Sequence, residues 1–182
     1  MDSMVTQWES MKIELGQTEI VSRIQKIKLV LTDNDGVWTD TGVYYSDAGE
    51  IMKRFSIRDG MGVERLRDIG IETGIITGEI SGSVKKRAEK LQITHLYLGI
   101  KDKAKKLGEI LIETGLKQDE IAYIGDDYND LEVINIINQS GLTAAPQDAM
   151  PKIIDAVIYH CKMKGGQGAF RDFAEWIIAH RY

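Results

Sequence analysis

Short apolar segments alternate with segments of helical periodicity along most of this 182-residue chain. Strands are predicted at residues 27–32, 71–77, 95–98, 120–124, 142–144 and 156–159. Helices are predicted at residues 18–26, 59–69, 83–91, 102–114, 128–137, around Pro151 and at 168–180. Because consecutive parallel strands need a crossover connection, this alternation predicts an α/β fold with a doubly wound, Rossmann-like parallel sheet.

The length predicts a single domain at residues 18–182, preceded by an N-terminal extension at residues 1–17. Within the domain, two apolar stretches flank a Ser-Asp-Ala-Gly turn, so residues 37–56 are expected to form a β-hairpin flap. Residues 165–182 are expected to form a glycine-rich segment and the closing helix. With two prolines and no low-complexity segment, the chain offers no obvious linker between domains.

Composition argues against several classes of partner. The formal net charge of -5 argues against nucleic acid, because phosphate backbones need a concentrated basic surface. No apolar segment approaches the length needed to span a bilayer, so no membrane is expected. Cys161 is the single cysteine and cannot form an internal disulfide, which predicts a cytoplasmic protein with an inert thiol.

Two carboxylates, Asp33 and Asp35, directly follow the first apolar strand in the sequence Asp33-Asn34-Asp35-Gly36. The carboxyl edge of a parallel sheet is where ligands usually bind, so this placement suits attack on a phosphate. The alternative is an ordinary turn, since Asp, Asn and Gly are all favoured turn residues. The motif alone does not decide between the two.

Other polar groups follow the later strands in the same way. Thr77-Gly78-Glu79 follows the second strand, Lys103 begins the helix after the third, and Gly125-Asp126-Asp127 follows the fourth. Each has an alternative role: a plain turn for Thr77-Gly78, a solvated helix face for Lys103, and helix capping for Asp127 or Asp130. The ligand spacing of a calcium loop is missing from both acidic motifs.

Together these residues predict a phosphate-ester hydrolase. Asp33 is expected to be the nucleophile, and Asp35 the general acid and base. Thr77, Gly78 and Lys103 are expected to hold the phosphoryl oxygens. Mg²⁺ prefers hard oxygen ligands, and the expected ones are Asp33, the Asp35 carbonyl and Asp126.

The motifs at Asp33–Val37, Thr77-Gly78, Lys103 and Gly125–Asp127 resemble those of the haloacid dehalogenase superfamily of phosphatases, over residues 25–182. The resemblance implies a haloacid dehalogenase-like fold and the same roles for these residues. There is room only for the hairpin after the first motif, so the chain is expected to lack a cap domain. Capless relatives form homotetramers in which neighbours cover each other's active sites, and a homotetramer with shared sites is expected here.

Further stretches, among them Arg58-Asp59-Gly60 and Gly165–Arg171, resemble the phosphatases of 3-deoxy-D-manno-octulosonate 8-phosphate and of nonulosonate 9-phosphate. The resemblance implies substrate contacts by Arg58, Glu79, Lys90 and Arg171. Glu79 and Gln167 stand where octulosonate enzymes usually carry Arg, which favours the nonulosonate and leaves the octulosonate as the alternative. A non-catalytic oligomerisation module is a further alternative, but it predicts loss of Asp33, Asp35 or Asp126, and all three are present. Phosphoryl transfer to a sugar and nucleotidase activity have no discriminating residue.

Overall fold

A computed structural model of the chain describes residues 15–181, so the predicted N-terminal extension lies almost wholly outside the described residues. The elements are α1 (Gln17–Ile24), β1 (Leu29–Thr32), β2 (Val43–Ser46), β3 (Gly49–Lys53), α2 (Ile57–Asp68), β4 (Glu72–Ile76), α3 (Gly82–Leu91), β5 (His95–Tyr97), α4 (Lys103–Thr114), η1 (Gln118–Glu120), β6 (Ile121–Ile124), η2 (Tyr128–Asp130), α5 (Leu131–Ile137), β7 (Leu142–Ala145), α6 (Pro151–Ala156), β8 (Tyr159–His160) and α7 (Ala169–Ala179).

Six strands form one parallel sheet in the order β5-β4-β1-β6-β7-β8, which confirms the predicted doubly wound α/β fold. β1 lies in the middle, and its last residue, Thr32, is in register with Ile75 of β4 and Ile124 of β6. β1 is the point at which the strand order switches: β4 and β5 are added on one side of it, and β6, β7 and β8 on the other. Because all six strands of this sheet are parallel, the loops after β1, β4 and β6 leave from the same edge of the sheet. This is the position where open α/β sheets bind ligands.

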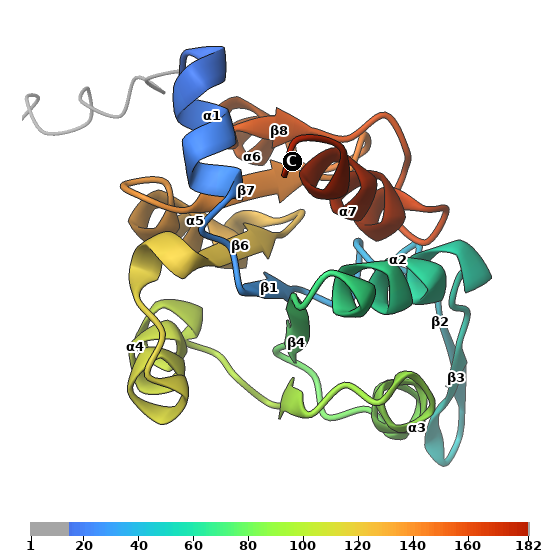
Figure 1. Cartoon of the computed structure of the whole chain (residues 1–182). Helices are drawn as coiled ribbons and strands as arrows, with labels where there is room; N and C mark the ends of the chain where they lie inside the picture. The colour runs from blue at the N-terminus through green and yellow to red at the C-terminus, as the bar shows by residue number, and fades with distance from the viewer. Residues whose placement is uncertain (1–14, 182) are drawn as a thin grey trace, which may run out of the picture.

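Helices cover both faces of the sheet (Figure 1). α1, α2, α3 and α7 lie on one face, and α4, α5 and α6 lie on the other. β1 is buried on both sides: Val30 packs into the first cluster of apolar side chains, whereas Leu29 and Leu31 pack into the second. This two-sided burial explains why the strand is a continuous apolar run rather than an alternating one.

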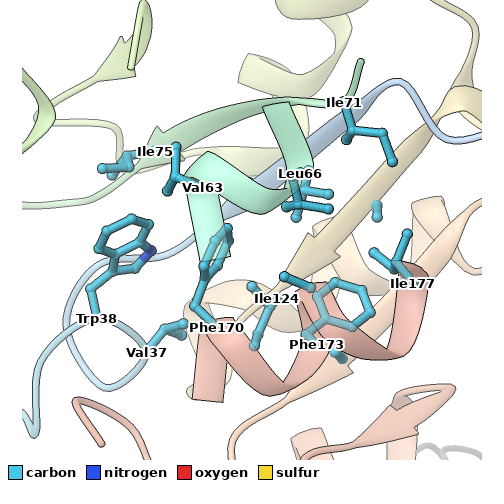
Figure 2. Packing of buried hydrophobic residues seen from close by; sticks show 14 of the residues in the cluster. Val37, Trp38, Val63, Leu66, Ile71, Ile75, Ile124, Phe170, Phe173 and Ile177 are labelled. Atoms are coloured by element: carbon cyan, nitrogen blue, oxygen red, sulfur yellow. The ribbon is translucent and has the colours of Figure 1, made fainter. Parts of the chain in front are cut away.

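The core between α2 and α7 also fixes the loop that follows β1. Figure 2 shows Val63 and Leu66 of α2 facing Phe170 and Phe173 of α7. Trp38 is fully buried beside them, with its ring centroid 4.8 Å from that of Phe170. The loop at the site is therefore anchored by a large aromatic side chain.

The hairpin flap and the absence of a cap domain are confirmed within residues 15–181. Only the β2–β3 hairpin lies between β1 and α2, and only α3, β5, α4 and the short η1 lie between β4 and β6. The hairpin stands away from the sheet, next to α3 (Figure 1). Every helix in this part of the chain is too short or too polar to cross a membrane.

Two predicted elements differ from the structure. The last strand is present, but its predicted bounds of 156–159 are wrong: α6 continues through Ala156, and β8 is the two-residue strand Tyr159–His160. The short apolar run at 156–158 carries no period that separates a helix end from a strand start. The helix predicted from Tyr128 begins with the 3₁₀ turn η2, which then continues as α5.

The glycine-rich segment packs directly against the loop after β1. The Gly166 amide donates to the Val37 carbonyl at 2.9 Å. A Cβ atom on Gly165 would fall 1.9 Å from the Gly36 carbonyl oxygen, which leaves no room for a side chain. Gly168 then forms the N-cap of α7, so the segment is a buried lead-in to this helix.

A pair of Gly→Ala substitutions tests this close packing. Gly165→Ala is expected to lower the free energy of unfolding by about 1–3 kcal/mol, because backbone must move to admit the methyl group. Gly108→Ala, on the exposed side of α4 with open space around it, is expected to raise it by about 0.5–1 kcal/mol. Urea unfolding measures both, and a Gly165→Ala protein as stable as the wild type would contradict the packing.

Candidate active site

Asp33 stands at the carboxyl edge of the sheet, directly after β1. Its amide donates to the Ile124 carbonyl at 2.9 Å, which continues the pairing of β1 with β6 by one residue. Its side chain is buried, and Oδ1 accepts a hydrogen bond from the Asn34 amide at 2.6 Å. Asp33 is thus fixed by backbone contacts on both sides.

Lys103 reaches Asp33 from the first turn of α4. Asp102 caps this helix by accepting a hydrogen bond from the Lys105 amide at 2.8 Å. Lys103 Nζ lies 2.9 Å from Asp33 Oδ2 and 2.6 Å from Asp130 Oδ1, and its side chain is only 1% exposed. The solvated-face alternative for Lys103 is therefore wrong.

Asp130 is a structural carboxylate whose two oxygens are both in use. Oδ2 accepts from the amides of Asp126 and Asp127, at 2.9 and 3.3 Å. Oδ1 accepts from Lys103 and from the buried Tyr123 hydroxyl, each at 2.6 Å. The expectation that Asp127 or Asp130 stabilises a helix start is confirmed for both, since Asp127 Oδ1 accepts from the Tyr128 amide at 2.6 Å.

The acidic cluster has perturbed titration. Burial, together with repulsion by Asp130, raises the pKa of Asp33 to about 7 against the attraction of Lys103. Burial, with repulsion by Asp33 and Asp130, raises the pKa of Asp126 to about 8. Burial disfavours the Lys103 ammonium, but the attraction of Asp33 and Asp130 outweighs it and raises the pKa of Lys103. The site lacks enough positive charge to hold all its carboxylates ionised.

Asp126 faces Asp33 across this cluster. Its Oδ1 is buried and has no hydrogen-bond partner among the described residues. One carboxylate oxygen from each of Asp33, Asp126 and Asp130 lies within 4.8 Å of the others. Gly36 lies against Asp126: a Cβ on Gly36, whose φ is +88°, would fall 1.9 Å from Asp126 Oδ2.

These residues fit a hard divalent cation. Carboxylate oxygens are the ligands that Mg²⁺ prefers, and the unpartnered Oδ1 of Asp126 is a ligand atom with no other role. Asp130 is less suited, because its oxygens already accept four hydrogen bonds. The fit therefore rests on Asp33 and Asp126.

Asp35 lies on the flap side of Asp33, with its carboxylate held by Lys53. Lys53 Nζ lies 2.7 Å from each Asp35 oxygen. Lys53 comes from β3 and was not predicted. A lysine at the end of a largely exposed hairpin carries no sequence signal of burial, and only an alignment of relatives or the fold itself would single it out.

The predicted phosphate-binding residues line one cleft with the aspartates. Thr77 is buried directly after β4, and its Oγ1 accepts from the Glu79 amide at 3.3 Å. The cleft has a volume of about 500 Å³, and its walls include Asp33, Asp35, Thr77, Gly78, Glu79 and Asp126. Lys103 lies beneath them, against Asp33. One chain thus brings all the predicted catalytic and phosphate-binding groups together.

The predicted sugar-binding residues are more scattered. Glu79 lies at the cleft with 63% of its side chain exposed, and its carboxylate is 3.9 Å from the Lys101 ammonium. Arg58 in the first turn of α2 and Lys90 in the last turn of α3 are exposed and do not line the cleft.

Arg171 stands near the start of α7, away from the cleft walls. Its Nε donates to Glu175 at 2.7 Å, and its amide donates to Asp59 Oδ1 at 3.0 Å. Asp59 also accepts from the Gly168 amide at 3.2 Å, and so ties the glycine-rich segment to α2. Contacts of Arg58, Lys90 and Arg171 with substrate stay predictions.

The chain is similar to characterised phosphatases over most of its length. None of the protein-family models matches it. Over 160 residues it is 37% identical to 3-deoxy-D-manno-octulosonate 8-phosphate phosphatase KdsC of Yersinia pestis, covering 88% of this chain and 84% of the relative. The KdsC protein of Escherichia coli K12 is 33% identical over the same shares.

Solved structures of related phosphatases are also similar to this chain. The phosphatase of the same name from Moraxella catarrhalis, in complex with magnesium, phosphate and KDO, matches with a TM-score of 0.84 at 32% identity, covering 91% of this chain and 94% of that one. The cobalt-bound deoxy-D-mannose-octulosonate 8-phosphate phosphatase of Haemophilus influenzae gives 0.83 at 33%, covering 87% and 91%. The chain therefore belongs to the haloacid dehalogenase superfamily, among its KdsC-like phosphatases. This confirms the predicted family, fold and enzyme class.

The crowded carboxyl groups predict a pH-dependent stability. Without metal, the Tm is expected to fall by several degrees between about pH 6 and pH 8. Because the pKa values of Asp33 and Asp126 are raised from 3.8 to about 7 and about 8, the folded chain binds more protons than the unfolded chain in this range. Stability therefore decreases as the pH rises, and the decrease ends above the raised pKa values.

Thermal unfolding in a chelating buffer measures this decline. Asp126→Asn removes one repelling carboxyl and should flatten it, whereas Asp155→Asn, at an exposed position of α6, should leave it unchanged. Adding Mg²⁺ to the wild type should raise the Tm most at pH 8, where both carboxyls ionise. An Asp126→Asn protein with the wild-type slope would contradict the electrostatic origin.

Proposed function

We propose that this chain hydrolyses the terminal phosphate monoester of a 3-deoxy-2-ulosonic sugar acid through an aspartyl-phosphate on Asp33. The observation that carries the proposal is the placement of Asp33 at the floor of the cleft, between the Lys103 ammonium and Asp126. Membership of the KdsC-like phosphatases supports the same chemistry.

The residues divide the reaction into two steps. In the first, a carboxylate oxygen of Asp33 attacks phosphorus and the ester bond breaks, while Asp35 gives a proton to the leaving alcohol. In the second, water attacks the aspartyl-phosphate and Asp35 takes a proton from it. Thr77, the Gly78 amide and Lys103 hold the phosphoryl oxygens, where negative charge is greatest.

Mg²⁺ is the proposed cofactor. Asp33, Asp126 and the Asp35 carbonyl would hold it, and waters would complete its shell. When bound, the ion offsets the repulsion between an anionic ester and an anionic nucleophile. The same charge would keep Asp33 and Asp126 ionised at neutral pH, against their raised pKa values. The magnesium and cobalt in two related structures support this choice.

The relatives favour an eight-carbon acid, since their names specify 3-deoxy-D-manno-octulosonate 8-phosphate. We therefore take this ester as the first candidate substrate, although the sequence favoured the nonulosonate. The nonulosonate 9-phosphate remains the second candidate because of Glu79, which lies at the cleft mouth as an exposed carboxylate. A carboxylate can accept hydrogen bonds from the extra hydroxyl groups of a longer sugar, which an Arg side chain cannot do.

A side-by-side rate comparison on the two esters with Mg²⁺ tests both parts of the proposal. The wild type should hydrolyse at least one ester efficiently. Asp33→Asn should lose turnover by at least about 10⁴-fold on both, because no nucleophile remains. Glu79→Arg should lower kcat/KM for the nonulosonate ester more than for the octulosonate ester, by about tenfold or more.

Equal effects of Glu79→Arg on the two esters would remove the case for the nonulosonate. Wild-type-like turnover in Asp33→Asn would overturn the covalent mechanism. Lys117→Met, at an exposed position far from the sheet edge that carries the site, is the control and should match the wild type.

We further propose a cytoplasmic homotetramer in which neighbours cover each other's clefts. The flap supports this: Tyr44, Tyr45, Ile51 and Met52 are each more than half exposed on the β2–β3 hairpin. Such clustered apolar side chains are typical of interaction surfaces. The exposed positions of Arg58 and Lys90 allow contacts with a neighbouring chain's substrate. The buried, unpaired thiol of Cys161 supports the cytoplasm.

Light scattering after size exclusion should give about four chains per particle. Replacing Tyr45 and Ile51 together by Ser should reduce the number of chains and the activity, because a flap with less apolar surface binds its neighbour more weakly. Ile112→Ser, at an 86% exposed position of α4, is the matched control and should change neither. A stable, fully active monomer would contradict shared sites.

A further inference from the structure

The flap delivers a buried lysine to the carboxylate of the general acid. Lys53 is the last residue of β3, and its side chain is 1% exposed. A buried ammonium is stable only when it is paired and hydrogen-bonded. Its partner is Asp35, with Nζ 2.7 Å from both carboxylate oxygens. The contact thus joins the flap to the residue that exchanges a proton with the substrate.

The two oxygens of Asp35 have unequal surroundings. Oδ1 accepts from the Asn34 side-chain amide at 3.0 Å, from the Thr39 hydroxyl at 3.2 Å and from Lys53. Among the described residues, Oδ2 accepts from Lys53 alone. Three donors saturate Oδ1, so it is unsuited to carry a proton. Oδ2 is the oxygen that remains for the leaving group.

Lys53 has a second ionic contact, with Glu50. Its Nζ lies 3.8 Å from Glu50 of the same strand. Glu50 accepts a hydrogen bond from the Ser81 hydroxyl, and Ser81 is the N-cap of α3. α3 follows the loop that carries Thr77 and Gly78. Lys53 therefore lies between the acid on one side and the helix behind the phosphate-binding loop on the other.

We propose that Lys53 is a positioning residue for Asp35: it bridges both carboxylate oxygens and fixes the carboxyl group so that Oδ2, the oxygen with fewer donors, passes the proton to the leaving oxygen. As the Asp33–phosphorus bond forms and the ester bond breaks, the proton on Oδ2 moves to the departing alkoxide. In the second step a proton of the attacking water moves to Oδ2 as the Asp33–phosphorus bond breaks. Lys53 keeps its own protons throughout and contributes only orientation.

The inference rests on the proposed function, and leaving-group chemistry tests it separately. A sugar phosphate leaves as an alkoxide and needs the acid, whereas 4-nitrophenyl phosphate leaves as a stable phenolate and does not. Lys53→Met should lower kcat/KM about 30-fold or more for the sugar-acid phosphate, but less than about threefold for the aryl ester. We choose kcat/KM because it reports the steps up to phosphoryl transfer to Asp33.

Further variants separate positioning from other roles of Lys53. Lys53→Arg should restore part of the loss on the sugar-acid phosphate, and Lys117→Met should lose nothing. Asp35→Asn should show the same selectivity for leaving group. Adding Lys53→Met to Asp35→Asn should cost less than about threefold more, because the residue that Lys53 positions is already absent.

The outcomes distinguish the explanations. Equal losses on both esters would overturn the inference, because they indicate that Lys53 binds the phosphate or supports the fold. Unchanged rates in Lys53→Met would overturn it too, as would losses that multiply in the double variant. A wild-type chain without turnover of either ester would overturn the proposed function, and the inference with it.

Discussion

The site depends on one buried lysine between two buried aspartates. The Lys103 ammonium cannot be isolated in the interior, so Asp33 and Asp130 must stay within hydrogen-bond distance of it. These three residues come from the end of β1, the start of α4 and the turn η2. One ion cluster therefore fixes three loops at the same edge of the sheet. Beyond the effect of burial, the same cluster also raises the pKa of Asp126, because Asp33 and Asp130 repel its carboxylate.

The order of the strands explains why this cluster forms where it does. β1 lies between β4 and β6, so the groups after these strands face each other across Asp33. The two hydrophobic clusters then hold opposite walls of the cleft. One packs α2, α3 and α7 behind the flap, and the other packs α4, α5 and α6 behind Lys103 and Asp126. Displacement of either layer would misalign one half of the site.

The sequence identified what lies at strand ends, because local pattern and sheet geometry together determine it. Asp33, Thr77, Lys103 and Asp126 were predicted on this basis, and so was the fold. Lys53, Tyr123 and the scaffold role of Asp130 depend on tertiary contacts that no periodicity encodes.

The close contact between Gly36 and Asp126 limits which amino acids can occupy position 36. A residue that performs no chemistry is normally expected to tolerate substitution. At position 36 any side chain would occupy the space of the Asp126 carboxylate, and the backbone there is left-handed. In a saturation library scored by activity, Gly36 would thus be as intolerant as Asp33. Intolerance to mutation at this edge of the sheet reports crowding as well as catalysis.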